Sequence, residues 1–142
     1  MKDSTKIIRH TITPRTPEHF IFLGIVSTEP DYRLSVMLNR QLGISLQHSG
    51  EEIIQGESSG AHHYSVFITT PETVSLVSNK SSGNILIRKL RNIDFIMVIH
   101  GAPDKVKAET LAASIRKNPA VTAVFCFDSR EISDRNLGLL MH

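Results

Sequence analysis

Two continuous apolar runs constrain the fold of this 142-residue chain more than any other feature. The runs at 20–26 and 93–99 are rich in Ile, Val and Phe, and each is short and ends in polar residues. Strands that are buried on both faces have this pattern, because no alternate side chain has to meet water. We therefore predict that both runs are central strands of one sheet.

Each apolar run is followed by a pattern typical of a helix. The first helix is predicted over about 29–42, with Thr28 as its N-cap and Gly43 as its stop. The second is predicted over about 103–117 and should end near Asn118. The expected inward side chains are Leu34, Met37, Leu38 and Leu42 in the first helix and Val106, Leu111 and Ile115 in the second.

The remaining segments are shorter and less regular. Period-two patterns predict strands at 62–70, 73–78, 84–90 and 121–127, a short strand at 44–47, and an edge strand at 6–13 that a short helix could replace. Residues 49–60 are acidic and contain glycines and serines, so we expect a long mobile loop. Ser129 is expected to cap a short terminal helix.

These elements together predict an α+β fold in a single domain, 1–142. Its sheet should have five to seven strands and be mainly antiparallel, with the two principal helices packed on one face. The segment 93–128 should form a strand–helix–strand crossover whose two strands are parallel. The residues expected in the core are Phe22, Leu38, Ile96, Val98, Leu111 and Phe125.

Composition limits the class of partner and the compartment. The 16 basic and 14 acidic residues leave a net charge of +2, which is too small to predict nucleic-acid binding. One cysteine, Cys126, excludes an internal disulfide and fits a reducing compartment. No apolar run approaches the roughly 20 residues that span a bilayer, and the first ten residues are polar. We therefore expect a cytoplasmic protein without a membrane partner.

The segment 86–95 resembles the signature of the bacterial IPExxxVDY family. Ile87 and Asp94 match that signature, whereas Arg88-Lys89 stand at its Pro-Glu and Phe95 at its Tyr. The resemblance extends from Phe20 to Phe127 and includes Asp31-Tyr32-Arg33-Leu34, Leu38-Asn39, Leu42-Gly43 and Asn118-Pro119-Ala120-Val121. It implies a fold and a soluble bacterial setting, and it implies no reaction.

Candidate catalytic and metal-binding residues lack the spacing that their chemistry needs. His62 and His63 are adjacent in a predicted strand, so they point to opposite faces. No His-Glu-x-x-His pattern or comparable zinc motif is present. Cys126 lies in an apolar strand, where a thiol is usually a packed side chain rather than a nucleophile. We expect no catalytic residues, no metal and no cofactor.

Two polar features leave alternatives open. Asp94 opens an apolar strand and is either a buried general base or an acceptor of backbone N–H groups in the turn from Leu90 to Ile93. His100, Gly101 and Asp104 lie in a strand-to-helix turn, a place where small ligands often bind. The N–H groups of that helix start are candidates for holding a small anion.

Two further groups are candidates for an interaction surface. Asp31, Tyr32 and Arg33 begin the first helix and combine acidic, aromatic and basic groups. Arg88, Lys89 and Arg91 should be exposed, because three close cations gain nothing from burial. They either prevent pairing of a strand end or meet an acidic surface, on a partner or on residues Glu51, Glu52 and Glu57 of a second copy.

The sequence therefore favours a non-enzymatic binding or assembly module that acts through a protein–protein surface. Its partner would be a second copy, giving a homodimer, or an unidentified protein. The alternative is a regulatory domain that binds a small molecule at the turn 100–104.

Overall fold

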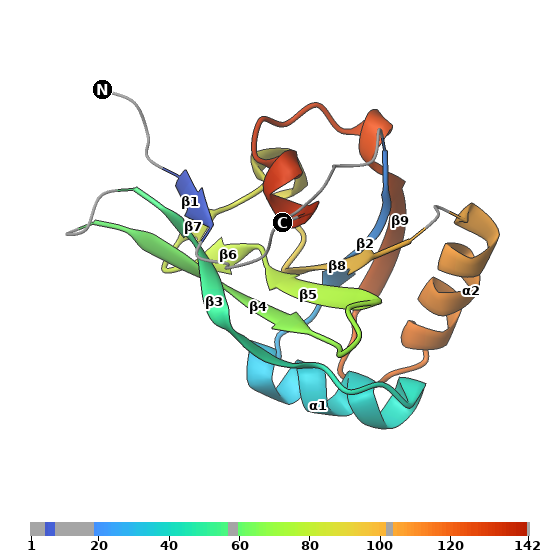
Figure 1. The fold of residues 1–142 in the computed structure, drawn as a ribbon. Helices are drawn as coiled ribbons and strands as arrows, with labels where there is room; N and C mark the ends of the chain where they lie inside the picture. The colour runs from blue at the N-terminus through green and yellow to red at the C-terminus, as the bar shows by residue number, and fades with distance from the viewer. Residues whose placement is uncertain (1–4, 8–18, 57–59, 102–103, 142) are drawn as a thin grey trace.

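The computed structural model describes residues 5–7, 19–56, 60–101 and 104–141. Figure 1 shows the arrangement of its helices and strands. The strands are β1 (Thr5–Ile7), β2 (Ile21–Val26), β3 (Gln47–Gln55), β4 (His62–Ile68), β5 (Val74–Ser78), β6 (Lys80–Ser81), β7 (Asn84–Ile85), β8 (Phe95–Ile99) and β9 (Ala123–Asp128). The helices are α1 (Asp31–Leu42) and α2 (Lys105–Ile115), with short 3₁₀ helices η1 (Arg88–Leu90), η2 (Ser129–Glu131) and η3 (Leu137–Met141).

Seven strands form one sheet in the order β1-β3-β4-β5-β8-β2-β9, and every pair of neighbours in it is antiparallel. This confirms the predicted α+β class with a mainly antiparallel sheet. β8 and β9 both pair with β2, so they are parallel to each other, as predicted for the crossover through α2. β1 and β9 are the two edge strands.

The two helices cover one face of the sheet, as predicted. Ile21, Leu23 and Ile25 of β2 point to this face, where they pack in one cluster with Leu34 of α1 and Ala112 of α2. The alternation of side chains along a strand sends their neighbours in sequence to the opposite face. The sheet therefore separates two apolar layers.

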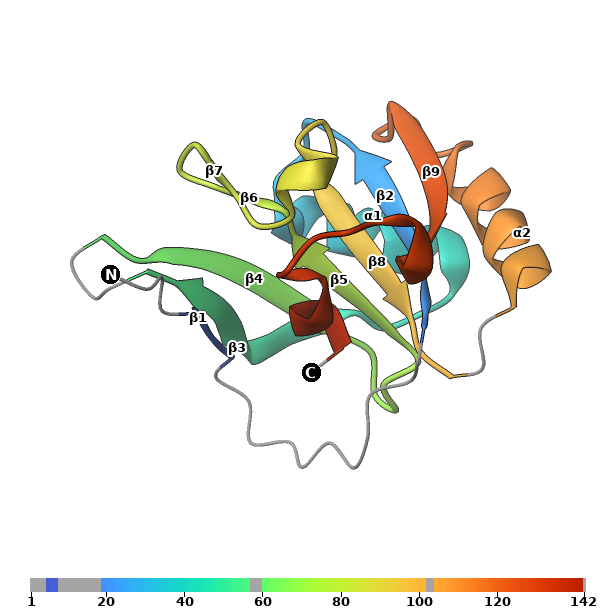
Figure 2. The same cartoon turned by 90° about the horizontal axis from the view of Figure 1, so that it is seen from above.

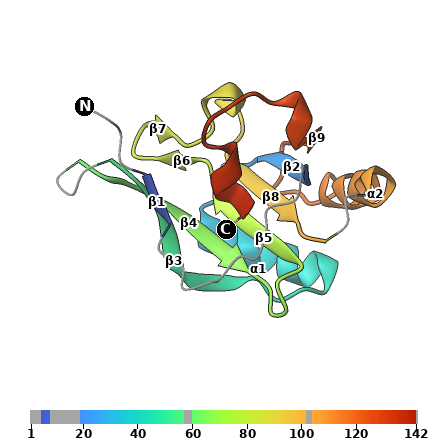
Figure 3. The ribbon, with the colours of Figure 1, turned by 45° about the horizontal axis from the view of Figure 1, so that its top comes forward.

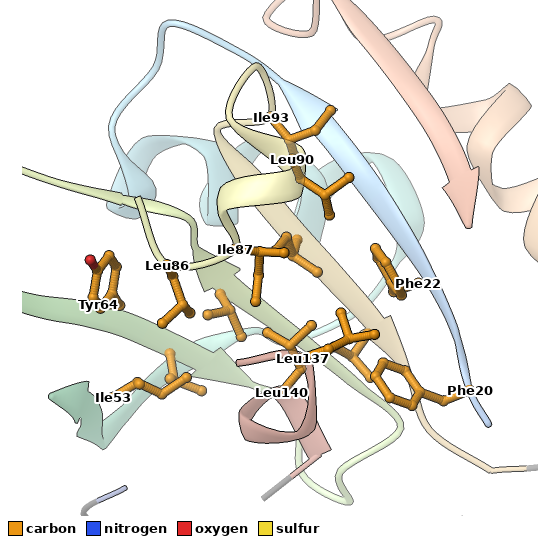
Figure 4. Close-up of a cluster of buried hydrophobic side chains, with 14 residues drawn as sticks. Phe20, Phe22, Ile53, Tyr64, Leu86, Ile87, Leu90, Ile93, Leu137 and Leu140 are labelled. Carbon is orange, nitrogen blue, oxygen red and sulfur yellow. The ribbon is translucent and has the colours of Figure 1, made fainter. Parts of the chain in front are cut away.

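The opposite face is covered by the turn that contains η1 and by the C-terminal η3 (Figures 1 and 4). Figure 4 shows Leu86, Ile87 and Leu90 from the turn, and Leu137 and Leu140 from η3, around the side chains of the sheet. All five are at most 7 % exposed. Leu137 and Leu140 of η3 therefore cover this second core.

The predicted loop at 49–60 is wrong for most of its length. Residues up to Gln55 belong to β3, which pairs with β1 on one side and β4 on the other. The pairing is irregular between His48 and Glu52, where Gly50 has a φ of 79°. Glycine and acidic residues in that bulge interrupt the strand pattern without ending the strand. Residues 57–59 lie outside the described part.

The predicted strand at 84–90 is also wrong. Only Asn84–Ile85 is a strand, and it pairs with Lys80–Ser81 in a small separate hairpin. The chain then bends through η1, because Leu86, Ile87 and Leu90 all turn into the core instead of alternating. A strand could not bury two consecutive residues on one face.

Other corrections concern helix ends and core residues. α1 begins after Pro30 rather than Thr28, since Pro30 O accepts hydrogen bonds from the N–H groups of Arg33 and Leu34.

Val106 points outward, because α2 uses two alanines and Ile115 to approach the sheet. Phe125 is 49 % exposed on the edge strand β9, whereas Phe22, Leu38, Ile96 and Val98 are fully buried as predicted and Leu111 is partly buried. Of the predicted strand at 6–13 the structure describes residues 6 and 7, which belong to the edge strand β1 (Thr5–Ile7); residues 8–13 lie outside the described part.

Candidate functional site

A buried asparagine holds the turn from residue 86 to 93 in one conformation. The side-chain amide of Asn79 donates hydrogen bonds to the carbonyl oxygens of Leu90 and Ile93, each 2.9 Å long. Its side-chain oxygen accepts a hydrogen bond of 2.8 Å from the N–H of Ile87. Asn79 is completely buried, so these bonds do not compete with water. The backbone of the turn is therefore a rigid platform.

The rigid platform presents three cations to solvent. Ile87, Leu90 and Ile93 point into the core, so Arg88, Lys89 and Arg91 are left on the outer side and are exposed. Their exposure confirms the prediction, although they lie on a 3₁₀ turn and not on an alternating strand.

A groove lies between this turn and the edge strand β9. It has a volume of about 610 Å³, and we name it the basic groove; its lining residues are Arg88, Lys89, Leu90, Arg91, Asn92, Ile93, Phe125, Phe127 and Ile132. Phe127 stacks on the buried Phe22 with ring centroids 5.3 Å apart, and Phe125 lies 6.4 Å from Phe127 on its outer side. The aromatic wall is thus attached to the core at one end and exposed at the other. Figure 2 shows the yellow turn and the red β9 on either side of β2.

The three cations of the basic groove form no ion pair with a described residue. Three cations elsewhere on the surface do: Arg33 pairs with Glu29, Lys80 with Asp94, and Arg130 with Asp128. Asp134 contacts the turn of the groove, but it accepts a hydrogen bond from the backbone N–H of Lys89 and not from a charged side chain. The side-chain charges of the groove remain available to a partner.

Side chains occupy part of the open edge of β9. Arg116 donates two hydrogen bonds to the carbonyl oxygen of Val124, at 3.1 and 2.8 Å. The carboxylate of Glu131 accepts a hydrogen bond of 2.8 Å from the N–H of Asp128. The helix α2 also lies beside β9 (Figure 1). Side chains therefore satisfy backbone groups near both ends of this edge.

The second predicted site, at 100–104, is occupied by the chain's own groups. His100 Nε2 lies 3.2 Å from a carboxylate oxygen of Glu72 and 3.0 Å from the hydroxyl of Ser75. In a nucleophilic triad the serine and the acid bond to opposite ring nitrogens, so this arrangement does not have triad geometry. The carboxylate of Asp104 accepts hydrogen bonds from the N–H groups of Val106 and Lys107.

Asp104 is thus the N-cap of α2 and already supplies the negative charge that this helix end favours. Gly101 is exposed, with a φ of 102°. Residues 102 and 103 lie outside the described part. An anion at this turn would have to displace the Asp104 carboxylate.

The predicted surface at Asp31, Tyr32 and Arg33 lies apart from the basic groove. Asp31 accepts a hydrogen bond from the N–H of Tyr32, and Arg33 pairs with Glu29 at 3.3 Å. Tyr32 is 63 % exposed. Asp31 lines a separate hollow of about 290 Å³ together with Lys80 and Asp94.

Asp94, directly before β8, bonds to two other segments of the chain. Its two carboxylate oxygens contact the N–H of Ser27 at 2.9 Å and the ammonium of Lys80 at 2.8 Å. The prediction that Asp94 accepts N–H groups of the turn from Leu90 to Ile93 is therefore wrong. Asp94 accepts the N–H of Ser27 instead, and the side chain of Asn79 bonds to that turn. An acid engaged by a cation and an N–H group is suited to a structural role.

The remaining candidate residues have local roles. Cys126 is partly buried against the helix-covered core, and burial raises the pKa of its thiol, which disfavours the reactive thiolate. His62 lies 3.2 Å from the carbonyl oxygen of Ser81, and His63 lies 3.2 Å from Glu52. Within the described residues no three His, Cys, Asp or Glu side chains are grouped to hold a metal ion.

Sequence reasoning missed Asn79 and the aromatic wall of the groove. The pattern Val124-Phe125-Cys126-Phe127 did signal that both rings share one face of β9. What was missing was the position of β9 at the sheet edge, which exposes Phe125. For Asn79 the sequence gives no signal, because its partners are backbone groups.

Comparisons of the chain with protein-family models, with curated proteins and with solved structures find no match in any of the three. In the part of the chain that the structure describes, no helix has the length and apolarity needed to cross a membrane.

Proposed function

We propose that the protein is a non-enzymatic binding module that contacts another protein through the basic groove. One observation carries the proposal: the half-exposed ring of Phe125 lies beside three exposed cations that pair with no acid in the described part of the chain, on a turn that a buried asparagine fixes. Aromatic residues and arginine are enriched at protein interfaces, and a rigid platform reduces the entropy lost on binding.

We also propose that the chain is a member of the IPExxxVDY family, that it resides in the cytoplasm, and that its partner is a second copy or another protein. The family resemblance supports the first point, and the single Cys126 supports the second. Arg88 and Lys89, which replace the Pro-Glu of the family signature, lie on the rim of the groove. Partner choice at this surface would therefore differ between this chain and relatives that keep Pro-Glu.

Capture from a lysate of the native host tests the proposal. Wild-type protein is compared with Phe125→Ser and with the double variant Lys89→Glu/Arg91→Glu, and bound proteins are identified by mass spectrometry. We expect the same proteins to be lost from both variants. The matched controls are Val106→Ser and Lys105→Glu on the exposed side of α2, which should retain them. Proteins held equally by all variants would contradict the proposal.

The alternative, a regulatory domain that binds a small molecule at 100–104, has no comparable support. The polar groups there contact one another, and Asp104 occupies the helix start.

A further inference from the structure

The basic groove continues into a second hollow. This hollow has a volume of about 240 Å³ and is lined by Gly83, Asn84, Ile85, Arg88 and Arg91. Arg88 and Arg91 also line the basic groove, and we call this pair, which is shared by the two hollows, the guanidinium ridge. Figures 2 and 3 show the β6–β7 hairpin beside the yellow turn, on the side away from β9.

We propose that the two hollows form one docking site for an extended acidic protein segment that carries a large apolar side chain. The inference rests on the proposed function and adds the chemistry of the partner. The apolar side chain lies against Phe125, Ile93 and Ile132, and carboxylates on either side of it bond to the guanidinium ridge. Arginine binds carboxylates with two parallel hydrogen bonds, which fixes the direction of the segment.

Charge complementarity identifies the partner as acidic. The rim carries three positive charges that no described acid pairs with. The acids nearby are already engaged: Asp128 bonds to Arg130, and Asp134 accepts hydrogen bonds from the N–H groups of Lys89 and Asn136. A basic partner would meet uncompensated repulsion at this surface.

The shape favours an extended segment over a compact ligand. A compact anion fills one hollow and leaves the other side of the ridge empty. An extended segment reaches both hollows, because its residues i and i+2 point the same way. Arg116 and Glu131 already bond to the carbonyl oxygen of Val124 and the N–H of Asp128, which a segment adding to the sheet as a strand would need. The docked segment therefore lies across the side chains of the groove.

Fluorescence anisotropy with labelled peptides tests the inference. The first peptide has four glutamates around one phenylalanine, the second replaces the phenylalanine by serine, and the third replaces the glutamates by glutamines. We expect the first to bind most tightly, and each replacement to weaken binding at least fivefold. Raising the salt from about 0.02 M to about 0.5 M should weaken binding of the first peptide at least tenfold, because added salt screens exposed charges.

Protein variants locate the binding. Lys89→Glu/Arg91→Glu should weaken binding of the first peptide at least tenfold, whereas the matched control Lys105→Glu/Lys107→Glu on α2 should change it less than twofold. Thermal unfolding of each variant by circular dichroism establishes that it is folded. Equal binding by the groove variant and the control would overturn the inference.

Two other outcomes would also overturn it, each in favour of a different occupant. Tighter binding of a small amphipathic anion such as phenyl phosphate would indicate a compact ligand. Salt-sensitive self-association in light scattering, abolished by Lys89→Glu/Arg91→Glu, would indicate a second copy. Failure of the peptides, combined with lysate partners that depend on the groove, would overturn the acidic segment and leave the proposed function standing.

Discussion

The basic groove and the turn at 100–104 differ in where their polar groups find partners. At the turn, His100 contacts Glu72 and Ser75, and Asp104 caps α2. In the basic groove the side chain of Asn79 bonds to three backbone groups of the turn, but the charged side chains form no ion pair with a described residue. The sequence made both regions candidate sites. They differ in whether their polar side chains contact other groups of the described chain.

This difference teaches how a binding surface can be distinguished from a structural cluster of the same composition. Polar side chains that satisfy one another stabilise the fold, and their removal leaves unpaired groups behind. Exposed cations without partners contribute little to stability, so their replacement should change binding and leave folding intact. Four tests follow from this distinction.

The largest expected effect is the difference in unfolding free energy between a substitution in the core and one in the aromatic wall of the groove. Ile96→Ala should lower the free energy of unfolding by about 2–5 kcal/mol, because Ile96 is fully buried in β8. Phe125→Ala should cost less than about 1 kcal/mol, since half of that ring is already in water. Urea denaturation measures both. Equal losses would show that Phe125 belongs to the core.

A slightly smaller effect tests whether the groove is a rigid platform. Asn79→Ala should cost about 2–4 kcal/mol, because one N–H group and two carbonyl groups of the turn lose their buried partner. Asn92→Ala is the matched control: Asn92 is exposed on the same turn, and its loss should cost less than about 0.5 kcal/mol. A change below about 1 kcal/mol for Asn79→Ala would mean that the turn is held by its leucine and isoleucine side chains alone.

The third test compares a charge from each region. Asp104→Ala should cost about 1 kcal/mol, because the N–H groups of Val106 and Lys107 lose their acceptor, and Asp104→Asn should restore most of the loss. Lys89→Glu should stay within about 0.5 kcal/mol of the wild type. A larger loss of stability for Lys89→Glu than for Asp104→Ala in thermal unfolding would contradict the distinction between charges that stabilise the fold and charges without a partner.

The smallest effect concerns pH. Hydrogen bonds from the Arg130 side chain, and then from its backbone N–H, lower the pKa of Asp128 from 3.8 to about 2. A carboxyl with a lowered pKa in the folded state stabilises the protein above its ordinary pKa, and the contribution disappears as pH falls toward 2. The unfolding midpoints of the wild type and Asp128→Asn should therefore converge between about pH 4 and pH 2. Glu109→Gln, an exposed change on α2, is measured beside it as the control.

Much of the fold could be predicted because burial and side-chain period act locally. The apolar runs that became β2 and β8 and the leucine stripe of α1 are visible along the chain. The errors arose where distant pairing decides the structure. β3 is a strand because β1 and β4 lie beside it, although its own residues Glu51, Glu52 and Gly50 disfavour one.

The candidate site could be predicted only in part, for the same reason. The cations at 88–91 were identified because charge is a property of single residues. The aromatic wall was not, since Phe125 reaches them only when β9 takes the edge position next to β2. Asn79 acts on backbone groups 8 to 14 residues away, and no side-chain pattern records that interaction.

The central claim is that the basic groove, and not the turn at 100–104, is the surface on which a partner binds. Titration of ¹⁵N-labelled protein with the acidic phenylalanine peptide, followed by amide chemical shifts, tests it most directly. The account predicts shifts concentrated at residues 83–93, 125–127 and 132, with little change at 72–75 and at 100–107. Shifts concentrated around His100 and Asp104 instead, or a spectrum that the peptide leaves unchanged, would contradict it.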